Sequence, residues 1–143
     1  MPNETTHAGY VISDDPSRLD PTAIHAYLSR SYWAANRSRE IVATSLANSL
    51  GIGLYTPTGE QVGFARVISD YAMFAYLCDV YVLEDHRGHG LAKAVLRHID
   101  AHPHLQNLRR FHLVTQDARG PYGQFGFTPI KNPERHMERR TTS

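Results

Sequence analysis

A long apolar segment leads directly through a short glycine-containing loop into an amphipathic helix, and few folds accommodate that succession. Phe74 to Leu83 is almost entirely apolar, which predicts a strand buried near the centre of a sheet. The loop Arg87-Gly88-His89-Gly90 follows it. Beyond the loop, one helical face carries apolar side chains at Leu91, Ala92, Val95, Leu96 and Ile99. The chain therefore needs a sheet with a helix packed on it.

The segments before this stretch complete most of that sheet. Tyr10 to Ile12 predicts a first strand, and helices are expected to begin at Asp20-Pro21 and at Ser38. Residues 52–56 alternate in the manner of a strand, and residues 61–69 form a second strand-like run. Turn residues separate the two from each other and from the strand that starts at Phe74. These three strands predict an antiparallel meander.

The segments after the long helix predict one more strand, a short helix and a final strand pair. The strand covers residues 111–115, the short helix runs from Asp117 to Gln124, and the pair combines residues 126–128 with residues 136–139. The expected order is βααβββαβαββ, an α+β or mixed α/β fold with a mostly antiparallel sheet flanked by helices. We expect a single domain over residues 1–143, with residues 1–9 as a loose polar segment.

Composition excludes several classes of protein. A net charge of +1 over 143 residues argues against a dedicated nucleic-acid or anionic-membrane binder. The basic residues between Lys131 and Arg140 are interrupted by acids, which favours a solvated surface over an RNA contact. The polar N-terminus predicts no signal peptide, and apolar runs are too short for a membrane helix. With Cys78 as the only cysteine, we expect a cytoplasmic protein without disulfides.

Metal binding is not expected either. His98 and His102 stand four residues apart on one helix face, but the glutamate that accompanies two such histidines in zinc proteases is absent. Structural histidines beside the apolar face are the simpler interpretation.

The loop between the central strand and the long helix has the chemistry of an anion site. Free amides and the dipole at a helix N-terminus favour negative charge, and Gly88 and Gly90 let the backbone approach a phosphate. Arg87 adds guanidinium donors. Neither a Walker sequence nor the third glycine of a dinucleotide fingerprint is present, since Lys93 occupies that place. A purely structural connector is the alternative.

Two motifs stand in the expected order, Arg87-x-x-Gly90-x-Ala92 at the loop and Tyr122-Gly-Gln-Phe-Gly126-Phe127 after the next strand. Together they resemble the GNAT superfamily of acyl-CoA-dependent N-acyltransferases. Arg87-x-x-Gly90-x-Ala92 is similar to the family's Arg/Gln-x-x-Gly-x-Gly/Ala signature. Tyr122-Gly-Gln-Phe-Gly126-Phe127 is similar to its Tyr-x-x-x-Gly-Phe element, although Pro121 and Gly123 depart from the usual pattern. The resemblance covers residues 51–128.

The resemblance implies acetyl-CoA as co-substrate and no metal. It implies that the CoA pyrophosphate binds at Arg87, Gly88, His89, Gly90, Leu91 and Ala92. The main chain of Val80 and Val82, with Leu83 nearby, would hold the pantetheine arm and the acetyl carbonyl. Asp117 stands where the family often contacts that arm, and helix capping is its alternative role.

The resemblance also implies direct attack by a primary amine, with Tyr122 as the general acid that protonates the leaving thiolate. Asp79, a carboxylate within an apolar strand, is the candidate general base, and Asp70 is the second candidate. A core position is expected for Cys78. Candidate acceptor-binding aromatics are Tyr27, Tyr32, Trp33, Phe74 and Tyr76.

Two functions follow from this reasoning. The first is an acetyl-CoA-dependent N-acetyltransferase, acting on a small amine more readily than on a protein. The second is a non-catalytic acyl-CoA-binding sensor or interaction module. The final strand pair, if exposed, also makes a homodimer possible through extension of a neighbour's sheet.

Overall fold

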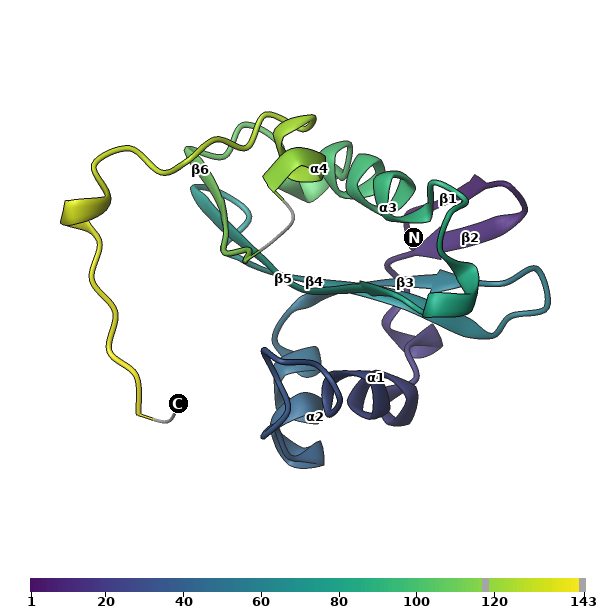
Figure 1. Ribbon diagram of the computed structural model, residues 1–143. Coiled ribbons are helices and arrows are strands. Elements are labelled where there is room, and N and C mark those ends of the chain that lie inside the picture. Colours follow the sequence, from purple (N-terminus) through teal and green to yellow (C-terminus); the bar gives the residue numbers. More distant parts are fainter. Residues whose placement is uncertain (117–118, 142–143) are drawn as a thin grey trace.

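The computed structural model describes residues 1–116 and 119–141 and has the mixed α+β architecture that the sequence predicts. A six-stranded sheet runs in the order β1-β2-β3-β4-β5-β6 (Figure 1). Its strands are β1 (Glu4–His7), β2 (Tyr10–Ser13), β3 (Leu50–Tyr55), β4 (Gln61–Ser69), β5 (Phe74–Val82) and β6 (Arg110–Leu113). Neighbouring strands are antiparallel from β1 to β5, whereas β5 and β6 are parallel. The expected antiparallel meander is therefore β3-β4-β5.

Helices cover both faces of this sheet. On one face lie α1 (Pro21–Leu28) and α2 (Arg39–Ala47), and on the other lie α3 (Leu91–Asp100) and the short α4 (Arg119–Gly123) (Figure 1). The starts of α1 and α2 are as predicted, because the side chains of Asp20 and Ser38 accept hydrogen bonds from the amides of Ala23 and Ile41.

The core consists of two apolar layers separated by the sheet. Ile52, Leu77 and Val95 belong to the layer beneath α3, whereas Ile24 and Phe64 belong to the layer beneath α1 and α2. β4 and β5 contribute side chains to both layers, which explains why their sequences are apolar with so little alternation.

The N-terminal segment is a strand, which corrects the expectation that residues 1–9 are loose. Glu4–His7 pairs with Tyr10–Ser13 around a two-residue turn at Ala8-Gly9. Both turn residues have positive φ, 51° and 86°, the geometry that suits a tight antiparallel hairpin. The hydroxyl of Thr5 lies 2.9 Å from Nδ1 of His98, so the hairpin is also tied to α3.

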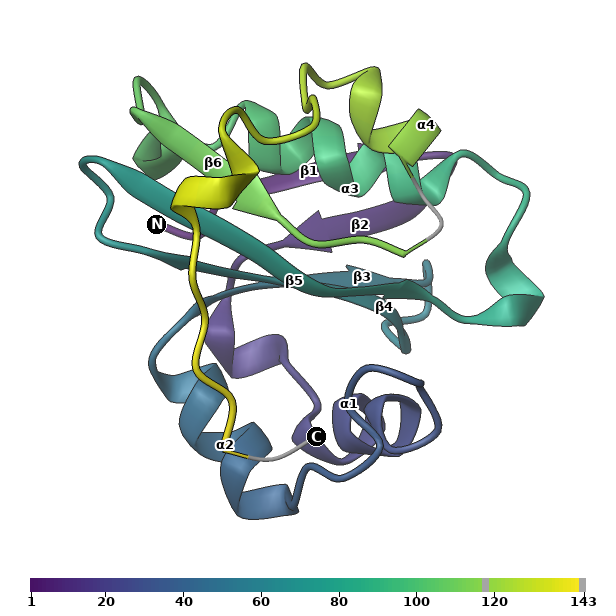
Figure 2. The same cartoon turned by 60° about the vertical axis from the view of Figure 1, so that its left-hand side comes forward.

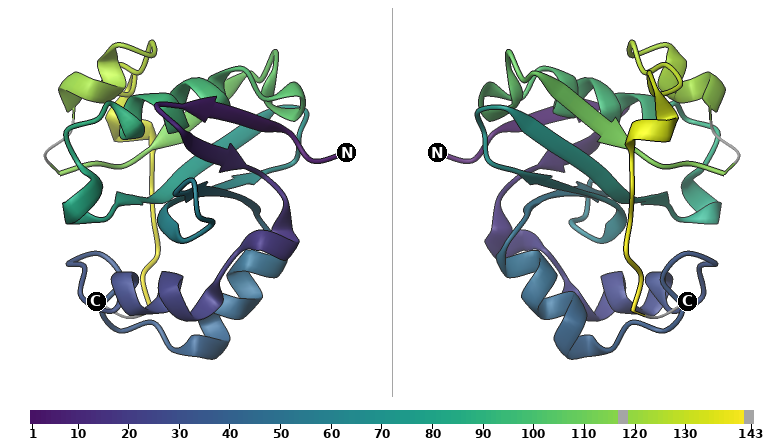
Figure 3. Two further views of the ribbon diagram at one scale, coloured as in Figure 1. Left: turned by 90° about the vertical axis from the view of Figure 1, so that its right-hand side faces the viewer. Right: turned by 90° about the vertical axis from the view of Figure 1, so that its left-hand side faces the viewer.

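The predicted C-terminal strand pair is wrong. In the described part of the chain, β6 is the last strand, and residues 126–128 and 136–139 are irregular. The segment after α4 passes from the α3 and α4 layer, along the β6 edge, to the layer of α1 and α2 (Figures 2 and 3). Its side chains are largely exposed, Met137 fully so. An alternating segment becomes a strand only where it has a partner strand, and none pairs with this one.

Candidate active site

The site begins where β5 loses one of its two neighbours. β6 pairs with β5 from Phe74 to Leu77, where the partner residue is Leu113. β4 pairs with β5 along its whole length, up to the pair of Gly63 with Val82. The last five residues of β5, Cys78–Val82, therefore have main-chain groups on the β6 side that no strand occupies. This open edge can hydrogen-bond an extended ligand as a strand would.

The open edge leads directly into the predicted anion loop. A single turn of 3-10 helix, Glu84–His86, follows β5, and α3 begins after Gly90. Gly88 and Gly90 have φ values of 88° and 70°, which L side chains rarely adopt. The first amides of α3 consequently face outward at the positive end of the helix dipole. The sequence motif thus has the geometry needed to receive a phosphate.

The exposed side chain of Arg87 fixes the end of β5 to the α1 layer. Its Nε donates to the carbonyl oxygen of Val82 at 2.9 Å, and its Nη2 donates to the hydroxyl of Tyr27 at 3.1 Å. Arg30 lies 4.5 Å from the centre of the Tyr27 ring and makes a two-bond ion pair with Glu84, at 2.6 and 2.8 Å. Those bonds lower the pKa of the Glu84 carboxyl to about 2. The loop is thereby connected to α1.

Sequence reasoning missed the contribution of the N-terminal hairpin to this loop. Nε2 of His7 lies 3.1 Å from the carbonyl oxygen of His89, and the Tyr10 hydroxyl lies 2.7 Å from Nδ1 of His86. The available signal was the Ala8-Gly9 pair between two short alternating segments, which is typical of a hairpin turn. The loop is thus supported from β1 and β2 as well as from α1.

Asp79 lies at a bulge in β5, immediately before the open main chain. Between the pairs Phe64–Tyr81 and Arg66–Cys78, β5 has one residue more than β4. The bulge is at Asp79, whose backbone has a φ of 56°. A bulge of this kind bends a strand and increases its local twist, here just before Val80.

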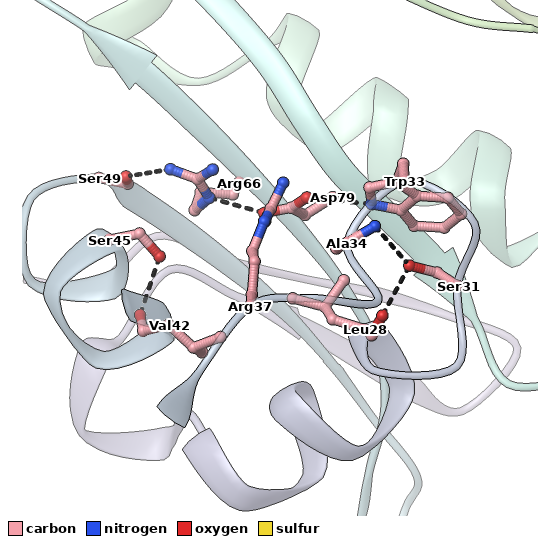
Figure 4. A network of polar contacts seen from close by, with 10 residues as sticks. All are labelled: Leu28, Ser31, Trp33, Ala34, Arg37, Val42, Ser45, Ser49, Arg66 and Asp79. Carbon is pink, nitrogen blue, oxygen red and sulfur yellow. Dashed lines mark hydrogen bonds and ion pairs between the residues drawn. The ribbon is translucent and has the colours of Figure 1, made fainter. Parts of the chain in front are cut away.

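The carboxylate of Asp79 is 1% exposed and accepts three hydrogen bonds (Figure 4). Oδ2 receives Nη1 of Arg37 at 2.7 Å and Nε of Arg66 at 2.9 Å. Oδ1 receives the indole Nε1 of Trp33 at 3.1 Å. The network joins the segment between α1 and α2 to β4 and β5. A buried carboxylate is costly unless it is paired and hydrogen-bonded, and this network supplies those partners to Asp79.

Tyr122 lies in α4 and packs against the layer beneath α3. Its ring meets Phe127 edge-on, with centroids 6.1 Å apart. It also borders a cavity of about 740 Å³ between β6, α3 and residues 125–131, which Leu77 and Thr115 line as well. Tyr122 therefore lies on the same face of the sheet as α3, and Thr115, two residues after the end of β6, shares its cavity (Figure 1).

The candidate acceptor-binding aromatics fall into two groups. Tyr27 stacks on Tyr81 with ring centroids 3.9 Å apart, and Tyr32 meets Trp33 edge-on at 5.2 Å. The second group, Phe74 and Tyr76, lies beside His112 at the paired end of β5 and β6 (centroids 6.3 and 5.6 Å apart). The first group contacts Asp79 through the hydrogen bond from Trp33. The second group lies on β5 several residues before Asp79.

Two further sequence assignments, those of Cys78 and Asp70, can be placed. Cys78 is partly buried, and burial raises the pKa of its thiol to about 11, which suits a core role. Asp70 accepts amide hydrogen bonds from the three residues at 72–74, which lower its carboxyl pKa, so it closes a turn. Asp117 lies outside the described residues. Within residues 1–116 and 119–141, we find neither a group of three ligands that could hold a metal nor a helix that could cross a membrane.

Comparison with known proteins identifies the family. Residues 29–129 match the sequence profile of the acetyltransferase (GNAT) domain, which is more than half of the chain. The chain belongs to the GNAT family of acetyltransferases. The matched range contains α2, the glycine loop and Tyr122.

Relatives in other organisms agree with membership in the GNAT family. A curated protein of Gibberella zeae, named "Putative acetyltransferase", is 33% identical over 86% of this chain and 81% of its own. A crystal structure from Xanthomonas campestris pv. campestris, described as a "putative acetyltransferase belonging to the gnat family", is 47% identical in sequence to this chain. It covers 95% of this chain and 96% of its own with a TM-score of 0.91. A Mycobacterium tuberculosis protein crystallised with CoA shares the fold at 20% identity, with a TM-score of 0.62 over 80% of this chain and 71% of its own.

Proposed function

We propose that this GNAT protein transfers an acetyl group from acetyl-CoA to the nitrogen of a small primary amine. The observation that carries the proposal is the open edge of β5, which runs directly into the glycine loop at the N-terminus of α3. One continuous surface thus offers main-chain hydrogen bonds for an extended arm and then amides for a diphosphate. That order matches the order of groups along CoA.

In the proposed complex, the amides of residues 87–92 and the guanidinium of Arg87 hold the pyrophosphate. Arg87 is exposed and donates to two neutral oxygens, so a phosphate oxygen is a stronger acceptor for it. The main chain of Val80 and Val82, together with Leu83, takes the pantetheine arm. An amide of this segment that donates to the thioester carbonyl would stabilise the negative charge that develops on that oxygen.

The proposed reaction is a direct displacement. The amine nitrogen attacks the thioester carbon and forms a tetrahedral intermediate, which collapses with cleavage of the carbon–sulfur bond. The sulfur leaves as a thiolate and takes a proton, for which we propose the hydroxyl of Tyr122 as donor. The nitrogen loses a proton and becomes an amide. No covalent enzyme intermediate is required, and the protonated thiol of Cys78 does not suit one.

We propose a positioning role for Asp79 in preference to its predicted role as general base. Its carboxylate is 1% exposed and already accepts three hydrogen bonds, two of them from guanidinium groups, so these donors enclose it. The same bonds hold the bulge that sets the direction of the following β5 main chain. The amine is then deprotonated through water.

Calorimetric titration with acetyl-CoA tests the binding site. We expect wild-type protein and the matched control Arg39→Glu, an exposed arginine on α2, to bind equally. Arg87→Glu is expected to weaken binding about tenfold or more, because a charge-assisted contact becomes a repulsion. Absence of binding by folded wild-type protein, or equal binding by Arg87→Glu, would refute the proposed phosphate site.

Turnover separates the enzyme from the non-catalytic acyl-CoA sensor. For Tyr122→Phe we expect kcat to fall about 100-fold, as for loss of a general acid, while the Kd for CoA stays within about twofold. The assay measures release of the CoA thiol with a panel of amines. A wild-type protein that binds acetyl-CoA but acetylates none of them would support the sensor.

A further inference from the structure

We infer that the acceptor amine of this enzyme carries a carboxylate, which binds in a pocket between α2 and β4 at Arg66. The inference rests on the proposed function and assigns a substrate class to it. The pocket has a volume of about 500 Å³. Its lining includes Glu40, Ile41, Ser49, Arg66 and Ile68.

The charge of the network beside this pocket is unbalanced. Arg37 and Arg66 share the single carboxylate of Asp79, which leaves one positive charge in excess. The Arg66 side chain is only 10% exposed and that of Arg37 is 28% exposed. A cation that is so little hydrated favours an anionic partner.

Arg66 also has donors left for such a partner. Its Nε donates to Asp79, and its Nη1 donates to the Ser49 hydroxyl oxygen at 3.1 Å (Figure 4). Its side chain also interacts with the Cys78 thiol, and the five N–H donors of a guanidinium outnumber these three partners. Because the Ser49 oxygen accepts from Arg66, its own hydrogen is free to donate. A guanidinium nitrogen and a hydroxyl next to each other match the two oxygens of a carboxylate.

The rest of the pocket fits an apolar stem. Ile41 and Ile68 stand on its two sides, on α2 and β4, and are 55% and 41% exposed. Covering them would remove apolar surface from water. Glu40 is the one acid in the lining, but it lies exposed in the first turn of α2, where water screens its charge more than that of Arg66.

The pocket is close enough to the reaction centre to serve it. Arg66 is bonded to Asp79, and Asp79 directly precedes Val80, the first residue of the proposed pantetheine segment. The Cα atoms of these two neighbours are about 3.8 Å apart, and we therefore propose that an aminocarboxylate reaches from Arg66 to the thioester. Its carboxylate would then lie at Arg66 and its amine at the open edge of β5.

Matched amines test the inference directly. The probes are L-leucine against L-leucinamide, and 6-aminohexanoate against 6-aminohexanamide, in turnover and in calorimetry with and without CoA. We expect each carboxylate to bind, or to show a kcat/KM advantage, about tenfold or more over its amide, since the amide lacks charge-assisted bonds. Equal use of both members of each pair would overturn the inference.

Three variants link the preference to the pocket. Ser49→Ala should weaken the carboxylate about fivefold and leave the amide unchanged, whereas Glu40→Gln should strengthen the carboxylate up to about threefold. Ser29→Ala, at the end of α1, is the matched control and should change neither. An equal loss for both probes in Ser49→Ala would assign Ser49 to structure and refute the anion site.

The two proposals fail differently. A protein that binds acetyl-CoA and acetylates carboxylates and amides alike keeps the proposed function and loses this inference. A protein that binds no acetyl-CoA loses the proposed function, and direct titration with the carboxylate probes still decides whether the pocket binds an anion.

Discussion

Replacing Asp79 with asparagine should cost this fold a large part of its stability. Asparagine has nearly the same volume and tolerates the φ of 56° at this position, so the substitution removes charge and leaves the backbone unstrained. Two guanidinium groups then lose their carboxylate, and the side chain of one of them is only 10% exposed. Breaking a buried ion pair by removal of one partner typically costs about 3–5 kcal/mol.

The partial exposure of Arg37 places the expected loss near the lower end, about 3 kcal/mol, because water can solvate that group after the change. With a urea dependence of roughly 2 kcal/mol per molar, the unfolding midpoint should fall by about 1.5 M. Urea unfolding at pH 7, followed by far-UV circular dichroism, measures this. Asp85→Asn, an exposed acid in the turn after β5, is the matched control and should change the free energy by less than about 0.5 kcal/mol.

A loss below about 1 kcal/mol for Asp79→Asn would refute the reasoning. It would mean that the two arginines find other partners or hydration, and that the network does not hold the bulge. The proposed positioning role of Asp79 would fail with it.

Three further predictions concern other parts of the structure. Gly90→Ala should lower the unfolding free energy by about 1–2 kcal/mol in the same urea assay and weaken acetyl-CoA binding, because alanine is strained at a φ of 70°; unchanged values would contradict a tight loop. Burial lowers the pKa of His98, so the unfolded state binds its proton more readily and stability falls as the pH drops below about 6.5. The difference in urea midpoint between pH 7.5 and 5.5 should shrink in His98→Gln, and an undiminished difference would refute this assignment. The Cys78 thiol, with its pKa raised to about 11, should react with iodoacetamide at pH 7.5 about 100-fold more slowly than in urea, measured by mass spectrometry; equal rates would show an accessible thiolate.

Sequence alone predicted the elements whose causes are local. Asp20 and Ser38 cap their helices through side chains only three residues from the amides they bind, so such starts can be recognised from spacing. The apolar run of β5 and the helical spacing of apolar residues after Gly90 likewise predict which side chains are buried. The place of the glycine loop between β5 and α3 followed from these neighbours, and its phosphate-binding role remains a proposal.

The parts that sequence did not predict depend on distant partners. Asp79 meets Trp33 and Arg37 across more than 40 residues of chain, so no spacing rule revealed that its carboxylate is enclosed by donors. The short β1 strand has few apolar residues, and its pairing depends on contacts such as that of Thr5 with His98. The last segment alternates like a strand but lacks a partner strand, which spacing cannot show.

Trp33 gives this molecule a built-in optical label. It is the single tryptophan of the chain, and its indole N–H donates to Asp79 at 3.1 Å, beside the bulge of β5. Indole emission responds to the loss of such a hydrogen bond and to nearby charge. Movement of the bulge, or an anion arriving near Arg37, would therefore alter the intrinsic fluorescence of the native protein. The contact that steadies β5 therefore lets changes at the bulge be followed in solution without any dye.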